Sequence, residues 1–350
     1  MRRKYALGKT GKRPQYDCIY CLRRLDGKDF NREHVLSDAF GAFRKALVLH
    51  YCVCRECNQF FADQLEVQFA RGAFEGMLRY RTGLKTPPEG ALHLRCVELA
   101  IPEGNEEWSG VRLKLMNEGG GLRVSLIAQA AFFDQRQERW VHVTEDEIDG
   151  GFLTRRPELK KGEIRIFARS AEEDRSVISR LREHGVNFQN ERRLEPPKGL
   201  LEAAEMEVEV TLRVNQGIRR CVAKYAFNYL ASVCGREFVL GADFDVVRQF
   251  IRYGNVPPYP LVVAGSEPIL FDDRPTIRQT NGHLLTLGWG KSLGDLVGEV
   301  SIFNSVTYRV SLCRDFSGNV WIPIRSGVHY DIGRKIVMPL IGFPKDLVPA

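Results

Sequence analysis

Several features are missing from this 350-residue sequence, and each absence narrows the class of protein. No apolar run approaches the roughly 20 residues that cross a bilayer. The N-terminus is charged, but the apolar stretch of a signal peptide does not follow it. We find no internal repeat and no low-complexity segment. The sequence therefore predicts a cytoplasmic chain without a membrane partner, and it indicates no oligomeric state.

Histidine is also scarce, with seven residues in the whole chain. Those beyond residue 90 stand apart from cysteines and from carboxylates, so they form no metal-binding motif. We interpret each of them as a structural or surface residue. They are His93, His142, His184, His283 and His329.

Cysteine, by contrast, is concentrated: five of the nine cysteines lie between residues 18 and 57. Two CxxC pairs, Cys18 with Cys21 and Cys54 with Cys57, are separated by 32 residues. Such pairs in a reducing compartment are typical of zinc sites. Four thiolates fill a tetrahedral shell, so the predicted zinc is structural. We assign Cys54 for its two-residue spacing to Cys57, and we interpret Cys52 as a buried apolar thiol.

Polar residues between and after these pairs carry a resemblance to a known family. Glu33 and His34 form a Glu-His dipeptide between the pairs, and Asn58 directly follows Cys57. This order resembles the zinc-containing branch of the HNH endonucleases, the ββα-metal nucleases, over about the first 85 residues. The resemblance implies that His34 is the general base, Glu33 an acidic metal ligand and Asn58 the central asparagine. The last histidine of the motif is absent, and Glu66, eight residues after Asn58, is nearest by spacing.

These residue types suit phosphodiester hydrolysis. A histidine with an ordinary pKa can accept the proton of a water near neutral pH, so His34 suits general-base work. Glu33, Asn58 and Glu66 would offer a cation only oxygen ligands, which favours Mg²⁺ or Mn²⁺. The resemblance implies DNA as the substrate, and products with 5′-phosphate and 3′-hydroxyl ends.

Each assignment has a plainer alternative. An isolated histidine such as His34 is often a core or surface residue. Asn58 comes where a helix is expected to begin, and asparagine is a strong N-cap. Glu66 and Asp63 could be solvated residues of that helix. The corresponding alternative function is a zinc-containing nucleic-acid-binding protein without catalysis.

Charge is unevenly divided along the chain. Residues 1–85 hold 17 Lys and Arg against 9 Asp and Glu, whereas the remainder holds 34 against 35. A basic segment beside a near-neutral remainder predicts a nucleic-acid footprint confined to that segment. The N-terminal arm suits phosphate contacts, although a solvated arm without a partner is the alternative. Its basic residues are Arg2, Arg3, Lys4, Lys9, Lys12 and Arg13.

The predicted fold class is α+β. We expect a basic arm over residues 1–14 and an HNH module with its zinc knuckle over residues 15–85. A Pro- and Gly-containing stretch at residues 86–90 then predicts a boundary. Residues 90–350 read as a larger mixed α/β partner domain rich in short strands, with a further division near 192–204. Its role is not indicated by any motif.

The pattern also predicts individual elements. Strands over residues 16–20 and 30–35, with a turn at 25–27, followed by a helix from residue 58 to about 80, would form the ββα arrangement. Three consecutive glycines at 119–121 predict a hairpin turn. Further helices are expected over residues 171–184, 219–233 and 243–253, the last capped by Asp243.

Overall fold

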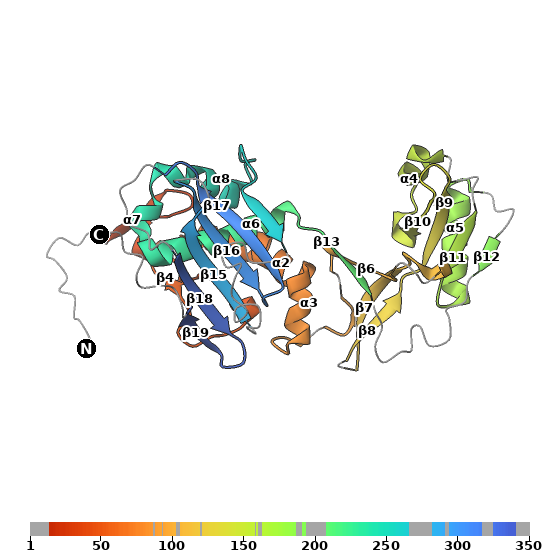
Figure 1. Ribbon diagram of the computed structural model, residues 1–350, viewed down its shortest axis with the longest axis horizontal. Helices are drawn as coiled ribbons and strands as arrows, with labels where there is room; N and C mark the ends of the chain where they lie inside the picture. The colour runs from red at the N-terminus through yellow and green to blue at the C-terminus, as the bar shows by residue number, and fades with distance from the viewer. Residues whose placement is uncertain are drawn as a thin grey trace. The chain divides into compact units, whose positions relative to one another are not determined.

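A computed structural model describes residues 14–86, 88–92, 94–102, 106–119, 121–157, 159, 163–186, 191–193, 208–265, 282–290, 294–316 and 325–340. Two compact units result: unit 1 joins Met1–Leu84 to Val214–Ala350, and unit 2 is Lys85–Arg213. Figure 1 shows both, coloured along the chain. The basic residues of the predicted arm, and His93, lie outside the described residues.

This division differs from the expected one. The first junction falls close to the predicted boundary at residues 86–90, but residues 214–350 belong to the same unit as the cysteine-rich module. The physical reason is burial of polar side chains. Lys224 and Arg248, from the C-terminal part of the chain, are almost fully buried and bond to groups of the module.

The module begins with a hairpin around the first CxxC pair. Strands β1 (Gln15–Asp17) and β2 (Arg24–Asp26) pair antiparallel. Next, β3 (Glu33–His34) pairs antiparallel with β4 (Val48–Leu49), and helix α1 (Arg55–Phe61) follows. The ββα arrangement is therefore β3, β4 and α1. The predicted first strand overlaps β1 of the separate β1–β2 hairpin, and the residues of the predicted turn at 25–27 instead end β2 and begin a 3-10 turn.

A nearly continuous helical run follows the second CxxC pair. It comprises α1, a π-helical turn η3 (Ala62–Glu66), α2 (Val67–Gly72) and α3 (Phe74–Arg81). Phe61, Leu65 and Phe69 are buried along one side, as the helical spacing predicts. The chain leaves the run through Gly83, whose φ of +71° is the left-handed conformation that glycine adopts readily.

The rest of unit 1 is a helix-covered sheet. Strands β14 (Val262–Gly265), β15 (Gly282–Trp289), β16 (Leu296–Ile302), β17 (Val306–Cys313), β18 (Arg325–Asp331) and β19 (Ile336–Pro339) pair antiparallel in the order β14-β17-β16-β15-β18-β19. Helix α6 (Gln216–Cys234) crosses this sheet in Figure 1 and packs on β15, β16 and β17.

Two shorter helices complete this half of unit 1. They are α7 (Arg236–Val239) and α8 (Asp245–Tyr253), and the 3-10 turn η7 (Ala242–Phe244) lies between them. Asp243 belongs to that turn, and the N-cap residue of α8 is Phe244. The expectation that Asp243 caps the helix is therefore wrong, because the 3-10 turn displaces the start of α8 by two residues.

Unit 2 contains two sheets. One has the order β13-β6-β7-β5, with β8 beside β7, and the other is β10-β9-β11-β12. The strands are β5 (Gly90–Ala91), β6 (Val97–Ala100), β7 (Arg112–Glu118), β8 (Gly121–Leu126), β9 (Gln129–Asp134), β10 (Arg139–Thr144), β11 (Ile164–Phe167), β12 (Glu191–Arg193) and β13 (Glu209–Leu212). β7 and β8 pair antiparallel with Glu118 opposite Gly121, so the hairpin prediction is confirmed.

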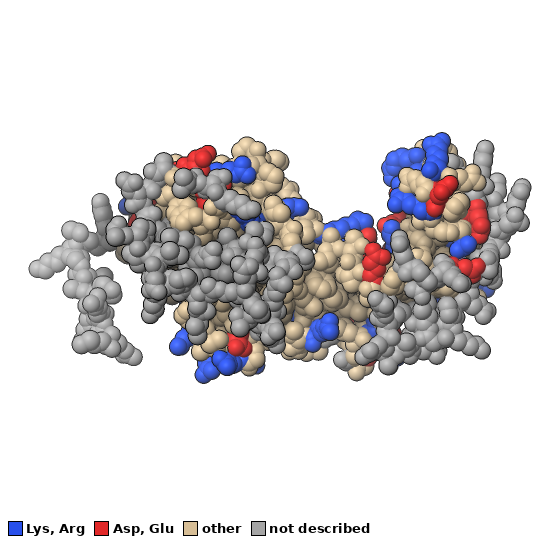
Figure 2. Space-filling view, in the orientation of Figure 1, with Lys and Arg blue, Asp and Glu red and all other residues tan. Residues whose placement is uncertain are grey.

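Helices α4 (Gly150–Arg155) and α5 (Ala171–Glu183) complete unit 2. An apolar cluster that includes Phe132, Ile166 and Leu181 forms its core. Figure 2 shows lysines and arginines gathered over α4, where Arg155 ends the helix and Arg156 lies over the ring of Phe152. Together the two units confirm the mixed α+β class. Among the described helices, none has the length and apolar character needed to cross a membrane.

Candidate nuclease site and cysteine cluster

The predicted zinc ligands come together at one point. The sulfur atoms of Cys18, Cys21, Cys54 and Cys57 all lie within 4.8 Å of one another. The Cys21 and Cys54 sulfurs are 3.8 Å apart. A tetrahedral zinc with bonds of about 2.3 Å holds its sulfurs about 3.8 Å apart, so the cluster has the dimensions of such a site. Cys52 lies outside the cluster, and its buried thiol donates to the backbone carbonyl of His50.

Local backbone geometry aims these thiols at one another. Leu22, just after the first pair, has a φ of +56°, and its N–H donates to the Cys18 carbonyl at 2.9 Å. This closes a tight turn that brings Cys18 and Cys21 to the same side. At the second pair, Cys54 is the N-cap residue of α1 and Cys57 lies in its first turn. The Cys54 N–H donates to the Cys18 sulfur at 3.4 Å, which joins the two pairs.

Side chains around the cluster hold it in place. Arg23 donates to the Cys21 sulfur at 3.4 Å and forms an ion pair with Glu56. From α8, the fully buried Arg248 donates to the Ile19 carbonyl at 2.9 Å, inside the first pair. The first knuckle is thus anchored by a residue 229 positions away in sequence.

The thiol electrostatics fit a divalent cation. Hydrogen bonds with Cys18 lower the pKa of Cys21 strongly and that of Cys54 to about 6. The same contacts raise the pKa of Cys18, through Cys21, and of Cys57, through Cys18. Crowded sulfurs therefore cannot all ionise unless a cation neutralises them, and a bound zinc would do so. The cluster is compatible with a structural zinc.

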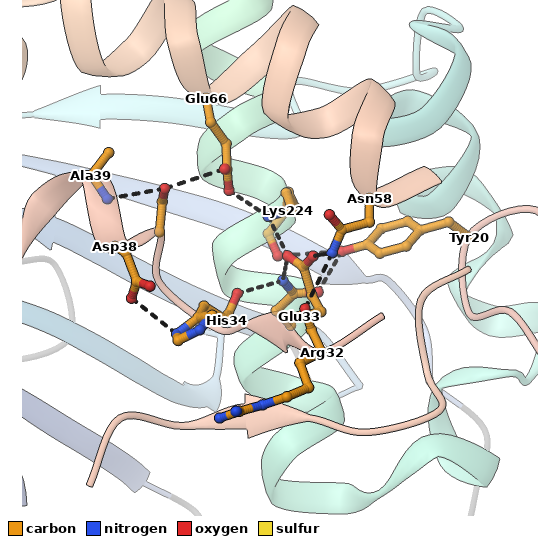
Figure 3. A network of polar contacts seen from close by, with 11 residues as sticks. Tyr20, Arg32, Glu33, His34, Asp38, Ala39, Asn58, Glu66 and Lys224 are labelled. Carbon is orange, nitrogen blue, oxygen red and sulfur yellow. Dashed lines mark hydrogen bonds and ion pairs between the residues drawn. The ribbon is translucent and has the colours of Figure 1, made fainter. Parts of the chain in front are cut away.

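His34 ends the short strand β3 at the protein surface. Its side chain is 32 % exposed, and its Nδ1 lies 3.0 Å from Oδ1 of Asp38, in the 3-10 turn η2 (Asp38–Phe40). Figure 3 shows the ring turned toward Asp38 and away from Glu33. Nδ1 is itself buried and forms no hydrogen bond with any described residue, so the approach of Asp38 is an ion-pair contact. Asp38 therefore places a negative charge beside a histidine ring that is partly open to solvent.

Glu33, on the other face of β3, is buried at 4 % exposure. The amide of Asn58 donates to its Oε2 at 2.6 Å and to the Arg32 carbonyl at 3.4 Å. Asn58 therefore lies inside α1 and faces β3, so the alternative that it caps the helix is wrong. The structure brings Glu33 and Asn58 into direct contact.

Glu66 ends the π-helical turn and points into the same cluster. Its Oε1 accepts a hydrogen bond from the Lys224 ammonium at 2.6 Å, and its Oε2 accepts one from the Ser37 hydroxyl at 3.2 Å. Only 18 % of its side chain is exposed. The alternative that Glu66 is a solvated helix residue is therefore wrong, whereas Asp63 is exposed and bonds only locally to Gln59.

Two residues of α6 complete the cluster, and sequence reasoning missed both. The ammonium of Lys224 forms an ion pair with Glu33 as well as with Glu66 (Figure 3). Asn228, one helical turn later, donates to Glu33 Oε1 at 2.9 Å and to the His34 carbonyl at 3.3 Å. Its Oδ1 accepts from the Tyr20 hydroxyl at 2.6 Å, which links the cluster to the first CxxC pair.

A signal for these two residues does exist in the sequence. Between Cys221 and Leu230, Lys224 and Asn228 are the polar residues with amide or charged groups in an otherwise apolar stretch. Their spacing of four places both on one helix face. A lysine and an asparagine on the buried face of an apolar helix need partners, although the sequence does not say which partners those are.

Burial and charge act against each other in this cluster. Burial raises the pKa of Glu33, and the nearby Lys224 charge offsets that rise only in part. Burial alone would lower the pKa of Lys224, but attraction to Glu33 and Glu66 outweighs it and the pKa is raised. The lysine is therefore charged at neutral pH, between two acidic side chains.

The predicted ligands of a catalytic Mg²⁺ or Mn²⁺ do not fit that ion as they are arranged. Each carboxylate oxygen of Glu33 and Glu66 already accepts from a protein donor. Asn58 turns its NH₂ group toward Glu33, and an amide NH₂ cannot bind a cation. A lysine ammonium lies where the ion was expected.

Comparison with known proteins agrees with the module's geometry. Residues 18–73 match the family model described as HNH endonuclease. The match takes in both CxxC pairs, β3, β4 and α1, so this segment of the chain is similar to the HNH endonucleases. This family domain supports a nuclease-type function and implies a nucleic-acid substrate. Neither a curated protein nor a solved structure matches the chain.

Proposed function

We propose that the chain is an endonuclease that hydrolyses phosphodiester bonds in DNA, with His34 as the general base. The observation that carries this proposal is the setting of His34. Its ring is 32 % exposed at the end of β3, and Asp38 contacts Nδ1 at 3.0 Å. A partly exposed histidine with a carboxylate beside its ring is an arrangement that general-base catalysis uses.

The proposed reaction needs few steps from the protein. Nε2 of His34 accepts a proton from a water molecule, and the resulting hydroxide attacks phosphorus. The bond from phosphorus to the 3′ oxygen breaks, and that oxygen leaves as a 3′-hydroxyl after it takes up a proton. Asp38 stabilises the imidazolium that forms. The products carry 5′-phosphate and 3′-hydroxyl ends, as the resemblance implies.

The metals have different places in this proposal. The four cysteines would hold a structural zinc with no open coordination position. The resemblance also implies Mg²⁺ or Mn²⁺ at Glu33, Asn58 and Glu66. Because Lys224 engages both carboxylates, no step of the proposed mechanism passes through a cation at those residues.

A plasmid-cleavage assay tests the proposal. Zinc-loaded wild type, His34→Ala and His50→Ala are compared in Mg²⁺, in Mn²⁺ and in EDTA. His50 is an exposed histidine close to the second CxxC pair, so it is the matched control. Cleavage should fall by about two to four orders of magnitude in His34→Ala, the usual effect of removing a general base. His50→Ala should cleave like wild type.

Two outcomes would contradict the mechanism. Wild-type cleavage by His34→Ala would exclude His34 as the base. A loss of DNA binding in His34→Ala, measured without turnover, would show that the residue acts in binding instead. Asp38→Asn adds a finer test: it should lower cleavage less than His34→Ala does, because it removes only the negative charge beside the ring and leaves the base in place.

One observation favours a second candidate function, a zinc-containing nucleic-acid-binding protein without catalysis. Glu33 and Lys224 are buried at 4 % and 1 % exposure, so neither can contact a phosphate directly. In this case wild type binds DNA and cleaves none under any metal condition. Deleting residues 1–13 should then weaken binding and flatten its salt dependence, because fewer phosphates are neutralised. An unchanged salt slope would exclude the arm from binding.

A further inference from the structure

Lys224 lies at the centre of the polar cluster and comes from the middle of α6. Its side chain is 1 % exposed, and its ammonium contacts Glu33 Oε1 and Glu66 Oε1. The aromatic rings of Phe61 and Tyr225 lie 5.6 Å and 5.3 Å from the ammonium. A single positive charge thus lies between two carboxylates, with aromatic rings enclosing it.

The carboxylate oxygens of Glu33 and Glu66 also accept hydrogen bonds from other side chains. Asn228 donates to Glu33 Oε1 at 2.9 Å and Asn58 donates to Glu33 Oε2 at 2.6 Å. Ser37 donates to Glu66 Oε2 at 3.2 Å. Mg²⁺ and Mn²⁺ need oxygen lone pairs in near-octahedral geometry. Such an ion would have to remove Lys224 and break this set of hydrogen bonds.

Moving the Lys224 side chain out of the cluster would be energetically unfavourable. Its backbone lies in the interior of a 19-residue helix that packs on β15, β16 and β17 and on the π-helical turn. Withdrawing the ammonium would leave Glu33 and Glu66 without a positive charge, and separating a buried ion pair is strongly destabilising. The folded protein therefore keeps Lys224 in the cluster, and a divalent cation does not displace it.

We propose that Lys224 permanently takes the place between Glu33 and Glu66 that a divalent cation was expected to hold. The positive charge at this place is the ammonium group of a side chain of α6. As a result, the native protein binds no Mg²⁺ or Mn²⁺ at these two carboxylates, and removal of the lysine creates a divalent-cation site there. The inference concerns ion binding and does not depend on DNA cleavage.

The test is Mn²⁺ binding to the zinc-loaded full-length protein, followed by the electron paramagnetic resonance signal of free Mn²⁺. Two pairs are compared: wild type with Glu33→Gln, and Lys224→Ala with the double variant Lys224→Ala/Glu33→Gln. The first pair should bind Mn²⁺ equally. Lys224→Ala should bind one more Mn²⁺ than its double variant, because two carboxylates then face a space without a cation.

Thermal unfolding gives a second readout of the same site. Lys224→Ala should unfold at a lower Tm than wild type in EDTA. Mn²⁺ at about a hundred times its Kd should then raise that Tm by roughly 5 to 10 °C. The double variant should show no such rise. Wild type should show the same small response to Mn²⁺ as Glu33→Gln.

Either of two results would overturn the inference. One is a wild-type Mn²⁺ site that Glu33→Gln abolishes, because the ion would then share the carboxylates with Lys224. The other is equal Mn²⁺ binding by folded Lys224→Ala and its double variant. If Lys224→Ala fails to fold in either condition, the comparison of wild type with Glu33→Gln decides alone. Glu66→Gln, at a less buried carboxylate, replaces Glu33→Gln if the latter does not fold.

Discussion

Glu75, in α3, is a second buried carboxyl group, and its setting differs from that of Glu33. Its side chain is 1 % exposed, and the hydroxyl of Tyr308 donates to its Oε1 at 2.6 Å. No ion pair to Glu75 occurs among the described residues. Burial raises the pKa of Glu75 to about 7, and the Tyr308 hydrogen bond offsets only part of that rise.

This raised pKa predicts a pH dependence of stability. In the unfolded chain Glu75 ionises near pH 4.5, whereas in the folded protein it keeps its proton up to about pH 7. Its contribution is therefore fully present below pH 4.5 and is lost as the pH rises through 7. The loss is on the order of 3 kcal/mol.

Denaturant unfolding between pH 4.5 and 8 measures this loss. Glu75→Gln should be flatter than wild type in that window. Glu237→Gln, at a carboxylate whose side chain is 78 % exposed, is the control and should follow wild type. Zinc release at low pH affects all three proteins alike, so the difference between variants is the quantity to compare. Parallel curves for Glu75→Gln and wild type would show that Glu75 does not titrate as described.

The cysteine cluster gives a second prediction at the residue scale. Elemental analysis should find one zinc per chain, and Cys57→Ser should lose it and unfold more easily, because an incomplete shell holds zinc weakly. Cys52→Ser is the matched control, since Cys52 is also buried and lies outside the cluster. It should retain zinc. Zinc loss from Cys52→Ser but not from Cys57→Ser would reassign the ligands.

At this scale, sequence reasoning reached the residues that neighbouring positions define. The CxxC spacing located the cysteine cluster, and the Glu33-His34 and Cys57-Asn58 pairs located one side of the polar cluster. Lys224 and Asp38 were missed. Asp38 is four positions after His34, and it faces His34 only because the chain turns back at η2. Lys224 meets Glu66 across 158 residues, a contact that no local pattern encodes.

Among the elements, the π-helical turn Ala62–Glu66 explains how Asn58 and Glu66 reach one cluster. Eight residues of a regular α-helix turn about 80° beyond two full turns, which would carry Glu66 away from the face of Asn58. A π turn closes i to i+5 bonds and rotates less per residue. The π turn thus accommodates one extra residue without rotating Glu66 away from the face of Asn58. Both side chains therefore reach their partners, which lie on α6 and β3.

This geometry predicts an unusual tolerance to deletion. Removing the exposed Gln64 should convert the π turn to α-helix and leave Asn58 and Glu66 seven residues apart, which is about two α-helical turns. Stability should change by about 1 kcal/mol or less. Deleting Gln249 from α8, an α-helix in the same unit, is the control. That deletion turns Phe250 and Ile251 away from the core and should cost several kcal/mol.

Chemical denaturation of both deletions and of wild type decides this point. Severe destabilisation by the Gln64 deletion would mean that the π turn is itself required. A comparable loss of stability in the two deletion variants would also mean that the π turn is required.

Sequence patterns identified most helices and one strand of the ββα arrangement, since the predicted strand at residues 30–35 contains β3, but they missed β4. β3 and β4 contain two residues each, which is too short for alternation to be read. The longer apolar and aromatic run at residues 16–20 was therefore predicted as the first strand. The π turn was also invisible, because Phe61, Leu65 and Phe69 keep a spacing of four through it.

On the scale of the whole molecule, unit 1 is built from two segments that are distant in sequence. Lys224, Asn228 and Arg248 all bond to groups of residues 1–84. Residues 1–84 alone would keep Glu33 and Glu66 without these partners. Composition could suggest a boundary near residue 86, but it could not show that residues 214–350 belong with the N-terminal module.

A truncation series tests this organisation. Residues 1–84 alone should show no cooperative unfolding, because the buried acids lack Lys224. Residues 1–84 joined to residues 214–350 by a flexible Gly/Ser linker of about 15 residues, with a span of about 20 Å, should fold cooperatively and retain zinc. The start of α6 lies against Gln68 of α2, as the close approach at Gly217 shows, so the second segment begins beside the module.

Circular dichroism, thermal unfolding and zinc content are the measurements. A cooperative transition for residues 1–84 alone would show that the module is self-sufficient. Failure of the linked protein to fold would show that unit 2 is required for unit 1.

The separation between Glu66 and Lys224 sets an order of events at the ribosome. The two residues are 158 positions apart, and synthesis at about 5–20 residues per second needs roughly 8 to 30 s to cover that distance. During this interval the nascent module has emerged, but the helix that neutralises its acids has not been made. Unit 2 is synthesised in between and can fold first. The cysteine-rich module is therefore made before unit 2 and completed after it.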